Sequence, residues 1–232
     1  MLTIRKSGER GVTRLDWLDS RHTFSFGDYY DPAATGCSVL RVINDDVVAP
    51  GAGFPTHPHR DMEIITWVLW GALEHRDSLG NGSIIRPGDA QRMTAGRGVT
   101  HSEFNPSTDE PVRLLQVWIL PDRQGLTPGY EQRHFAEADR RGRLCQIASP
   151  DGADGWITIH QDARVYAGLL DVGASAEQSL NAGRRAWLHV ARGAVQANGA
   201  RLGEGDGAAI EDEMQIAIVA TENSEVLLFD LP

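Results

Sequence analysis

The sequence predicts an all-β protein made of two antiparallel barrels or sandwiches. Three observations lead to this prediction: short segments rich in β-branched and aromatic residues, frequent turn sequences between those segments, and little helical periodicity. Glycine and proline supply 25 and 11 of the 232 residues, which favours many turns over a helical bundle. The stretch from Tyr130 to Arg140 is the best candidate for a helix.

The predicted strands share two features along the chain. Their side chains alternate in direction, and most of their residues are β-branched, aromatic or leucine. Turn sequences such as Pro87-Gly88-Asp89 and Asn198-Gly199 lie between them. The clearest examples are residues 38–44, 63–73, 113–120 and 225–231.

An internal repeat indicates that the two halves of the chain fold alike. Gly71-Ala72-Leu73 matches Gly193-Ala194-Val195, and Gly88-Asp89 matches Gly205-Asp206. In both copies a strand ends at a glycine, a hairpin follows, and a Gly-Asp turn opens the next strand, which favours two stacked barrels of similar build. The expected domains are residues 1–134 and 135–232.

The composition limits the partners of the protein. With 22 basic and 32 acidic side chains the formal net charge is −10, which argues against coating nucleic acid, since phosphate binding needs clustered Lys and Arg. The N-terminus lacks the apolar segment of a signal peptide, and the longest apolar run, 64–73, is too short to span a membrane. Cys37 and Cys145 are interpreted as reduced thiols, with a single bridge as the alternative. We expect a cytoplasmic monomer that binds neither nucleic acid nor a membrane.

Two pairs of polar residues could form a metal site. His57-Pro58-His59 and His101-Ser102-Glu103 each hold two metal-binding side chains two residues apart, and such side chains share one face of a strand. Three imidazoles and one carboxylate suit one borderline divalent ion: Fe²⁺, Mn²⁺, Ni²⁺, Cu²⁺, Co²⁺ or Zn²⁺. A six-coordinate ion would keep two positions open, which is typical of a reactive rather than a structural site.

At these residues the sequence resembles the cupin superfamily. The first cupin motif, G-x5-H-x-H-x3-E, is matched by Gly51, His57, His59 and Glu63, and the H-x3-N end of the second motif is matched by His101 and Asn105. One departure from general cupins is that Gly96-Arg97-Gly98 replaces the usual Pro-x-Gly element, as in the pirin family. The other stretches that resemble pirins are residues 20–26, 29–32, 56–63 and 93–103.

The resemblance to pirins implies a bicupin fold of two jelly-roll barrels, with a metal ion in the N-terminal barrel only. It implies His57, His59, His101 and Glu103 as ligands, iron as the usual metal, and a structural or supporting role for Glu63. Counting from the paired glycines of the repeat, none of the second-copy positions offers a good ligand, so we expect no metal in the second barrel. These positions are Ser179, Asn181, Ile218 and Ala220.

Bacterial pirin-like proteins are associated with quercetin 2,3-dioxygenase activity, so the resemblance implies that flavonols and O₂ are the substrates. In this hypothesis the metal ion lowers the pKa of the flavonol hydroxyl, Glu103 accepts its proton, and ring opening releases carbon monoxide. Apolar side chains could form the walls for a flat substrate, although core packing is the alternative role of each. They are Phe24, Phe26, Phe54, Met62, Met93, Phe104 and Trp118.

Two other functions fit the same residues. A metal-dependent regulatory or sensor protein would act through a protein partner with little turnover, as the animal pirins imply. A cupin isomerase, or a dioxygenase for another small oxygenated metabolite, would use the same ligands, because the flavonol assignment depends on the resemblance alone.

Overall fold

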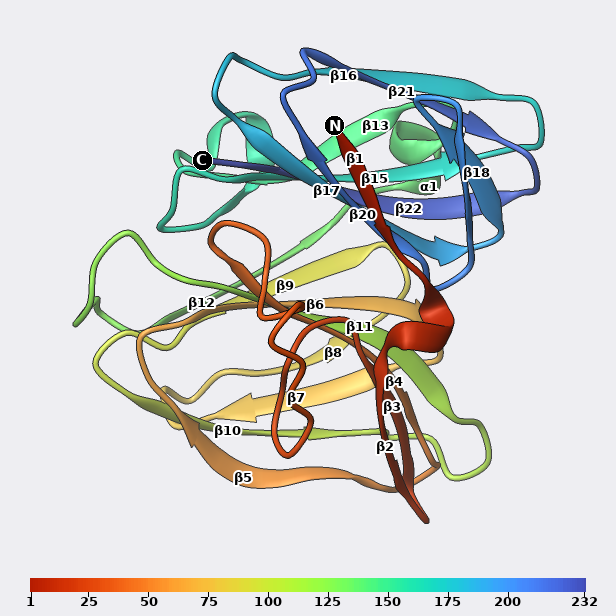
Figure 1. The fold of residues 1–232 in the computed structure, drawn as a ribbon. Helices are drawn as coiled ribbons and strands as arrows, with labels where there is room; N and C mark the ends of the chain where they lie inside the picture. The colour runs from red at the N-terminus through yellow and green to blue at the C-terminus, as the bar shows by residue number, and fades with distance from the viewer. The chain divides into compact units, whose positions relative to one another are not determined.

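The computed structural model describes residues 1–232, and the chain is almost entirely β-structure (Figure 1). It divides into two compact units. We call residues 11–134 with 151–161 the N-terminal unit, and residues 1–10, 135–150 and 162–232 the C-terminal unit. The expected boundary lies between residues 134 and 135. Each unit contains, in addition, one short segment from the other side of this boundary.

The N-terminal unit contains a seven-stranded and a four-stranded antiparallel sheet. The large sheet has the order β12-β9-β6-β11-β4-β3-β2, and the small sheet has the order β5-β10-β7-β8. Strands of the large sheet are β2 (Gly11–Leu15), β3 (Leu18–His22), β4 (Leu40–Val48), β6 (Glu63–Trp70), β9 (Asp89–Thr94), β11 (Val112–Ile119) and β12 (Gly129–His134). Strands of the small sheet are β5 (Gly53–His59), β7 (Leu73–Asp77), β8 (Gly82–Ile85) and β10 (Val99–Phe104). The segment 151–161 adds β14 (Ile157–Thr158) and the short helix η2 (Ala153–Gly155).

The C-terminal unit repeats this plan. Six of its strands form one sheet in the order β1-β20-β17-β22-β15-β13, and four form another in the order β16-β21-β18-β19. The first sheet contains β1 (Leu2–Arg5), β13 (Leu144–Ser149), β15 (Arg164–Leu170), β17 (Arg185–Arg192), β20 (Gly207–Glu211) and β22 (Ser224–Leu231). The second contains β16 (Ser175–Ser179), β18 (Ala194–Ala197), β19 (Ala200–Gly203) and β21 (Gln215–Ala220).

The all-β prediction with two similar domains is confirmed, and the repeat is visible in the strand order. Strands β6 to β9 and β17 to β20 follow the same sequence of turns, with Gly71 and Gly193 in the left-handed region at φ +81° and +72°. Each unit contains two open sheets, so a sandwich describes it better than a closed barrel. Ile218 and Ala220, the second-copy positions of His101 and Glu103, are buried in the apolar core of the C-terminal unit.

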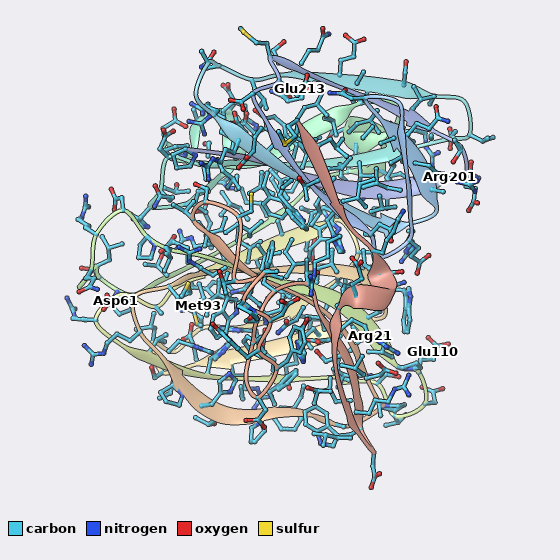
Figure 2. All side chains as sticks on the ribbon, in the orientation of Figure 1. Arg21, Asp61, Met93, Glu110, Arg201 and Glu213 are labelled. Atoms are coloured by element: carbon cyan, nitrogen blue, oxygen red, sulfur yellow. The ribbon has the colours of Figure 1, made fainter.

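Helices are short, and the prediction of a helix over residues 130–140 is wrong for its first half. Gly129–His134 pairs with β9 as an edge strand, and only α1 (Glu137–Arg140) is helical. The other helical turns are η1 (Ser7–Glu9) and η2 (Ala153–Gly155), and no helix combines the length and the apolar character needed to cross a membrane. Figure 2 shows Met93 inside the N-terminal unit, where it is fully buried, and Arg201 at the surface.

Candidate metal centre

Two neighbouring strands bring three histidines together. Strand β5 carries His57 and His59, and β10 places His101 directly opposite His57 in the pairing register. The ring centroids of the three histidines lie 4.5 to 4.8 Å apart. One nitrogen from each ring lies within 4.8 Å of the others, so this group could hold a metal ion.

The next strand, β7, supports His101 from behind. Asp77 lies opposite His101 and His75 lies opposite Glu103 in the pairing register. His75 donates its Nε2–H to Asp77 Oδ2 at 3.3 Å, which leaves Nδ1 of His75 as an acceptor. His101 Nδ1 lies 3.4 Å from that acceptor and therefore carries the hydrogen. The Asp77–His75 pair thus fixes the tautomer of His101, so that its Nε2 presents a lone pair.

His57 is oriented in the same way by the backbone. Its Nδ1–H donates to the Pro55 carbonyl oxygen at 2.8 Å, so its Nε2 also presents a lone pair. This Nε2 lies 3.1 Å from the Nε2 of His101. Two acceptor nitrogens that converge at this distance suit a shared cation, because they cannot satisfy one another by hydrogen bonding.

The electrostatics of the site keep the imidazoles of His59 and His101 neutral. Burial lowers the pKa of His59 to about 4, and the neighbouring His101 and His57 add to the effect. Burial also lowers the pKa of His101 to about 3, with smaller contributions from His57 and His75. Neutral imidazole is the form that binds metals, so these histidines are ready to coordinate an ion near neutral pH.

Glu103 lies at the edge of this cluster and is held by the large sheet. Gln116 Nε2 donates to both carboxylate oxygens, at 3.1 and 2.9 Å, and Thr66 Oγ1 lies 3.4 Å from Oε1. The carboxylate lies within 4.8 Å of ligand atoms of His75 and His101, and Glu103 lines the same cavity as His57 and His59. His75 has no free lone pair, because one of its nitrogens donates to Asp77 and the other accepts from His101. Each carboxylate oxygen has more than one lone pair, so Glu103 is the better candidate for a fourth ligand.

A polar row across the large sheet faces the histidines. Register pairs link His22 to Asn44, Asn44 to Gln116 and Gln116 to Thr66. Residues paired in this way share one face of the sheet. His22 Nδ1 lies 2.8 Å from Asn44 Oδ1, and its Nε2 lies 2.8 Å from Thr13 Oγ1. The polar face of the large sheet thus lies opposite the three histidines of the small sheet.

Between the two sheets lies a cavity of about 590 Å³. Of the expected apolar walls, Phe26, Phe54 and Trp118 line it, and the Trp118 ring lies edge-on to His59 at 5.0 Å. The prediction is wrong for the other four, which do not line this cavity. They are Phe24, Met62, Met93 and Phe104.

Glu63 matches the glutamate of the first motif, but it serves the framework. Its side chain is fully buried, and its Oε2 accepts hydrogen bonds from the Thr94 hydroxyl and the His160 backbone N–H at 3.1 and 3.2 Å. The His160 Nδ1 also lies 3.2 Å from this oxygen. Glu63 therefore anchors the segment 151–161 within the N-terminal unit.

The residues present fit a divalent ion of the borderline class. Three imidazoles converge, and the Glu103 carboxylate lies next to one of them, that of His101. The ring nitrogens that face away from the centre are engaged for His57 and His101. That these four residues bind one ion stays a prediction. The sequence interpretation missed His75 and Asp77, although His75-Arg76-Asp77 has the same spacing as the other two pairs.

The chain is similar to known proteins over its full length. Residues 4–119 match the family model described as pirin, and residues 146–231 match the quercetinase C-terminal cupin domain. The quercetin 2,3-dioxygenase of Escherichia coli K12 is 50% identical over 232 residues, covering 100% of this chain and 99% of that protein. A pirin-like protein of Caulobacter vibrioides is 44% identical and covers 92% of each chain. The crystal structure of the E. coli bacterial pirin YhhW in complex with nickel(II) has a TM-score of 0.95 at 50% identity, covering 100% of this chain and 99% of that chain.

Proposed function

The chain belongs to the pirin family, and from this premise we propose that it is a metal-dependent dioxygenase that opens the heterocyclic ring of quercetin-like flavonols. The observation that carries the proposal is the approach of two ring nitrogens beside a cavity of about 590 Å³. The Nε2 atoms of His57 and His101 lie 3.1 Å apart, and each presents a lone pair. The E. coli relative named quercetin 2,3-dioxygenase, which is 50% identical along the full chain, supports the reaction class.

We propose that one divalent ion is held by His57, His59, His101 and Glu103. The nickel(II) complex of the E. coli relative supports a metal of this class. Iron(II) is our choice for the active ion, because the reaction consumes O₂ and iron binds imidazole and carboxylate ligands well. A bound ion would act as a Lewis acid that lowers the pKa of the flavonol hydroxyl next to the ring carbonyl.

Glu103 is the residue suited to accept the proton of that hydroxyl. Gln116 and Thr66 are hydrogen-bonded to its carboxylate, which holds the carboxylate in one orientation. General bases need this positioning within hydrogen-bond reach of the proton that they remove. The products of the proposed reaction with O₂ are carbon monoxide and one ester. The ester joins two phenolic acid units, which derive from the two aromatic rings of the flavonol.

The walls of the cavity suit a flat substrate. Phe26, Phe54 and Trp118 offer aromatic surface, and the edge-on Trp118 also limits the rotation of His59. An aromatic ligand between these side chains would be separated from bulk water, which strengthens hydrogen bonds to it.

The test is a comparison of wild-type protein with the Glu103→Gln variant. Each is loaded anaerobically with iron(II), mixed with quercetin and then exposed to air. We expect the wild type to bleach the flavonol absorbance and to release carbon monoxide, and the variant to keep part of its metal affinity but to lose turnover.

Bleaching no faster than with free iron(II) would contradict the dioxygenase proposal. Should metal binding remain intact in that case, the regulatory alternative would be favoured. Co-purification of a protein partner with metal-loaded but not with metal-free protein would then test it.

A further inference from the structure

Asp46 on β4 is a buried carboxylate that is neither a proposed metal ligand nor a hydrogen-bond partner of one. It is 3% exposed, lines the cavity, and its Oδ1 has no hydrogen-bond partner. Ser20 lies opposite Asp46 in the pairing register and hydrogen-bonds its carboxyl group. The carboxylate therefore lines the cavity with Ser20 as its donor and with one covered oxygen left unsatisfied. A carboxylate with so few donors is destabilising in a buried position, and a ligand that brings a hydroxyl donor to its accessible edge would stabilise it.

The preceding residue, Asp45, has a structural role in the same sheet and differs from Asp46 in its hydrogen-bond partners. Asp45 points to the other face of β4 and receives two hydrogen bonds from Arg113, at 2.8 and 2.9 Å. Asp46 has no such cation. Burial, with further contributions from Asp45 and Glu103, raises the pKa of Asp46 to about 7, although the hydrogen bond from Ser20 opposes the shift.

The charges around the cavity restrict the ligand. Three carboxylate side chains line it, those of Asp28, Asp46 and Glu103, and no lysine or arginine does. An anionic ligand would be repelled by these groups, whereas a neutral ligand with hydroxyl donors could satisfy Asp46. The cavity thus favours neutral phenols over phenolic acids.

We propose that Asp46 is a specificity-determining residue that accepts a hydrogen bond from an aromatic hydroxyl group of a neutral polyphenol. This inference rests on the proposed function and names its substrate class. The hydroxyl concerned is not the one next to the ring carbonyl, because that one is required at the histidines of the small sheet, whereas Asp46 belongs to the large sheet.

The test is equilibrium binding under nitrogen to nickel(II)-loaded protein, followed by tryptophan fluorescence. The probes are quercetin, which carries several phenolic hydroxyls, and 3-hydroxyflavone, which keeps only the hydroxyl next to the carbonyl. The variants are Asp46→Asn and, as matched control, Asp16→Asn, which removes the same charge from an exposed position outside the cavity.

We expect Asp46→Asn to weaken quercetin binding about tenfold, as for loss of a buried hydrogen bond, and to change 3-hydroxyflavone binding by less than about twofold. Asp16→Asn should leave both affinities unchanged. Nickel content should stay the same, and the melting temperature of Asp46→Asn should equal or exceed that of the wild type, because a buried charge has been removed.

Three results would overturn the inference: no quercetin binding by the wild type, an equal effect of Asp46→Asn on both probes, or a melting temperature well below that of the wild type. The last would assign Asp46 to the framework. A third probe, 3,4-dihydroxybenzoate, should bind the wild type weakly and Asp46→Asn more tightly; the reverse order would be a fourth result that contradicts the inference. A wild type that binds quercetin but consumes no oxygen would contradict the proposed function alone.

Discussion

The Nε2 atoms of His57 and His101 lie 3.1 Å apart, and each presents a lone pair to the other. The contact follows from the register of β5 and β10, which places the two residues directly opposite one another. Each ring is held in this tautomer by the hydrogen bond that its Nδ1–H donates, to the Pro55 carbonyl oxygen for His57 and to Nδ1 of His75 for His101. The fold thus builds in an arrangement that a cation would stabilise.

The first prediction concerns the support of His101. Replacing His75 by Phe removes the acceptor of the His101 Nδ1–H but keeps an aromatic ring against Tyr130, whose ring centroid lies 4.9 Å from that of His75. We expect nickel(II) affinity, measured by calorimetry on the metal-free protein, to fall about 10- to 100-fold, as is typical when such supporting partners are lost.

The control for this variant is His134→Gln. His134 also pairs with an aspartate, Asp89, but it is largely exposed at the far edge of the large sheet. An unchanged nickel affinity in His75→Phe, or an equal loss in the control, would show that the Asp77–His75 pair does not orient the ligand.

The sequence was sufficient for the local part of the site. Side chains two residues apart share a face of a strand, so each pair of candidate ligands could be identified without a structure. The same rule applied to His75-Arg76-Asp77 would have found the supporting pair. What the sequence could not provide was the register between strands, and the row from His22 through Asn44 to Gln116 exists only because of that register.

The fold also divides into features that depend on local sequence, which were predictable, and long-range strand pairings, which were not. Short β-rich segments and the repeated Gly-Asp turns predicted the strands and the two similar units, because these depend on local preferences. Pairing of β1 with β20 was not predictable, since it joins residues about 200 positions apart. Strand β12 was mistaken for a helix because its polar residues, such as Glu131 and Arg133, have no strong strand preference, and its pairing with β9 decides the outcome.

A second prediction separates Glu63 from the metal ligands. Glu63→Ala leaves the Thr94 hydroxyl and the His160 backbone N–H without their buried acceptor. We expect a loss of about 3 kcal/mol in the free energy of unfolding in urea, with nickel affinity changed by less than about twofold. Glu74→Ala, which breaks only a surface ion pair with Arg76, should lose less than about 0.5 kcal/mol. A tenfold weaker nickel affinity in Glu63→Ala would instead identify this residue as a ligand or its direct support.

The third prediction is a pH dependence in the C-terminal unit. Although burial acts to raise it, hydrogen bonds from Lys6 and from the backbone N–H groups of Gly203 and Ser7 hold the pKa of Asp206 below its ordinary value of 3.8. A carboxylate with a lowered pKa in the folded state stabilises the fold above the unfolded pKa. Its contribution disappears as the pH falls through the folded value.

Asp206→Asn should therefore be less stable than the wild type by about 1 to 3 kcal/mol at pH 7, and the difference should shrink below about pH 4. Urea unfolding at a series of pH values measures it. The control is Asp171→Asn, which removes an exposed partner of Arg141 and should change stability by less than about 0.5 kcal/mol at any pH. A constant difference between Asp206→Asn and the wild type from pH 7 to pH 3 would contradict the prediction.

The fourth prediction tests the close approach of β5 and β10, on which the histidine cluster depends. A Cβ at Gly53 would lie 2.2 Å from the Glu103 carbonyl oxygen and 2.5 Å from Phe104 Cα, so backbone must move. Gly53→Ala should lose about 1 to 3 kcal/mol in the free energy of unfolding, and nickel affinity should fall with it because the strands that carry His57 and His101 are pushed apart.

Gly82→Ala is the matched control, since the nearest atom to its Cβ would be 3.9 Å away. That variant should gain up to about 1 kcal/mol from the lower entropy of its unfolded chain and bind nickel as the wild type does. Equal stability and equal nickel affinity in the two alanine variants would mean that strand separation does not control the site.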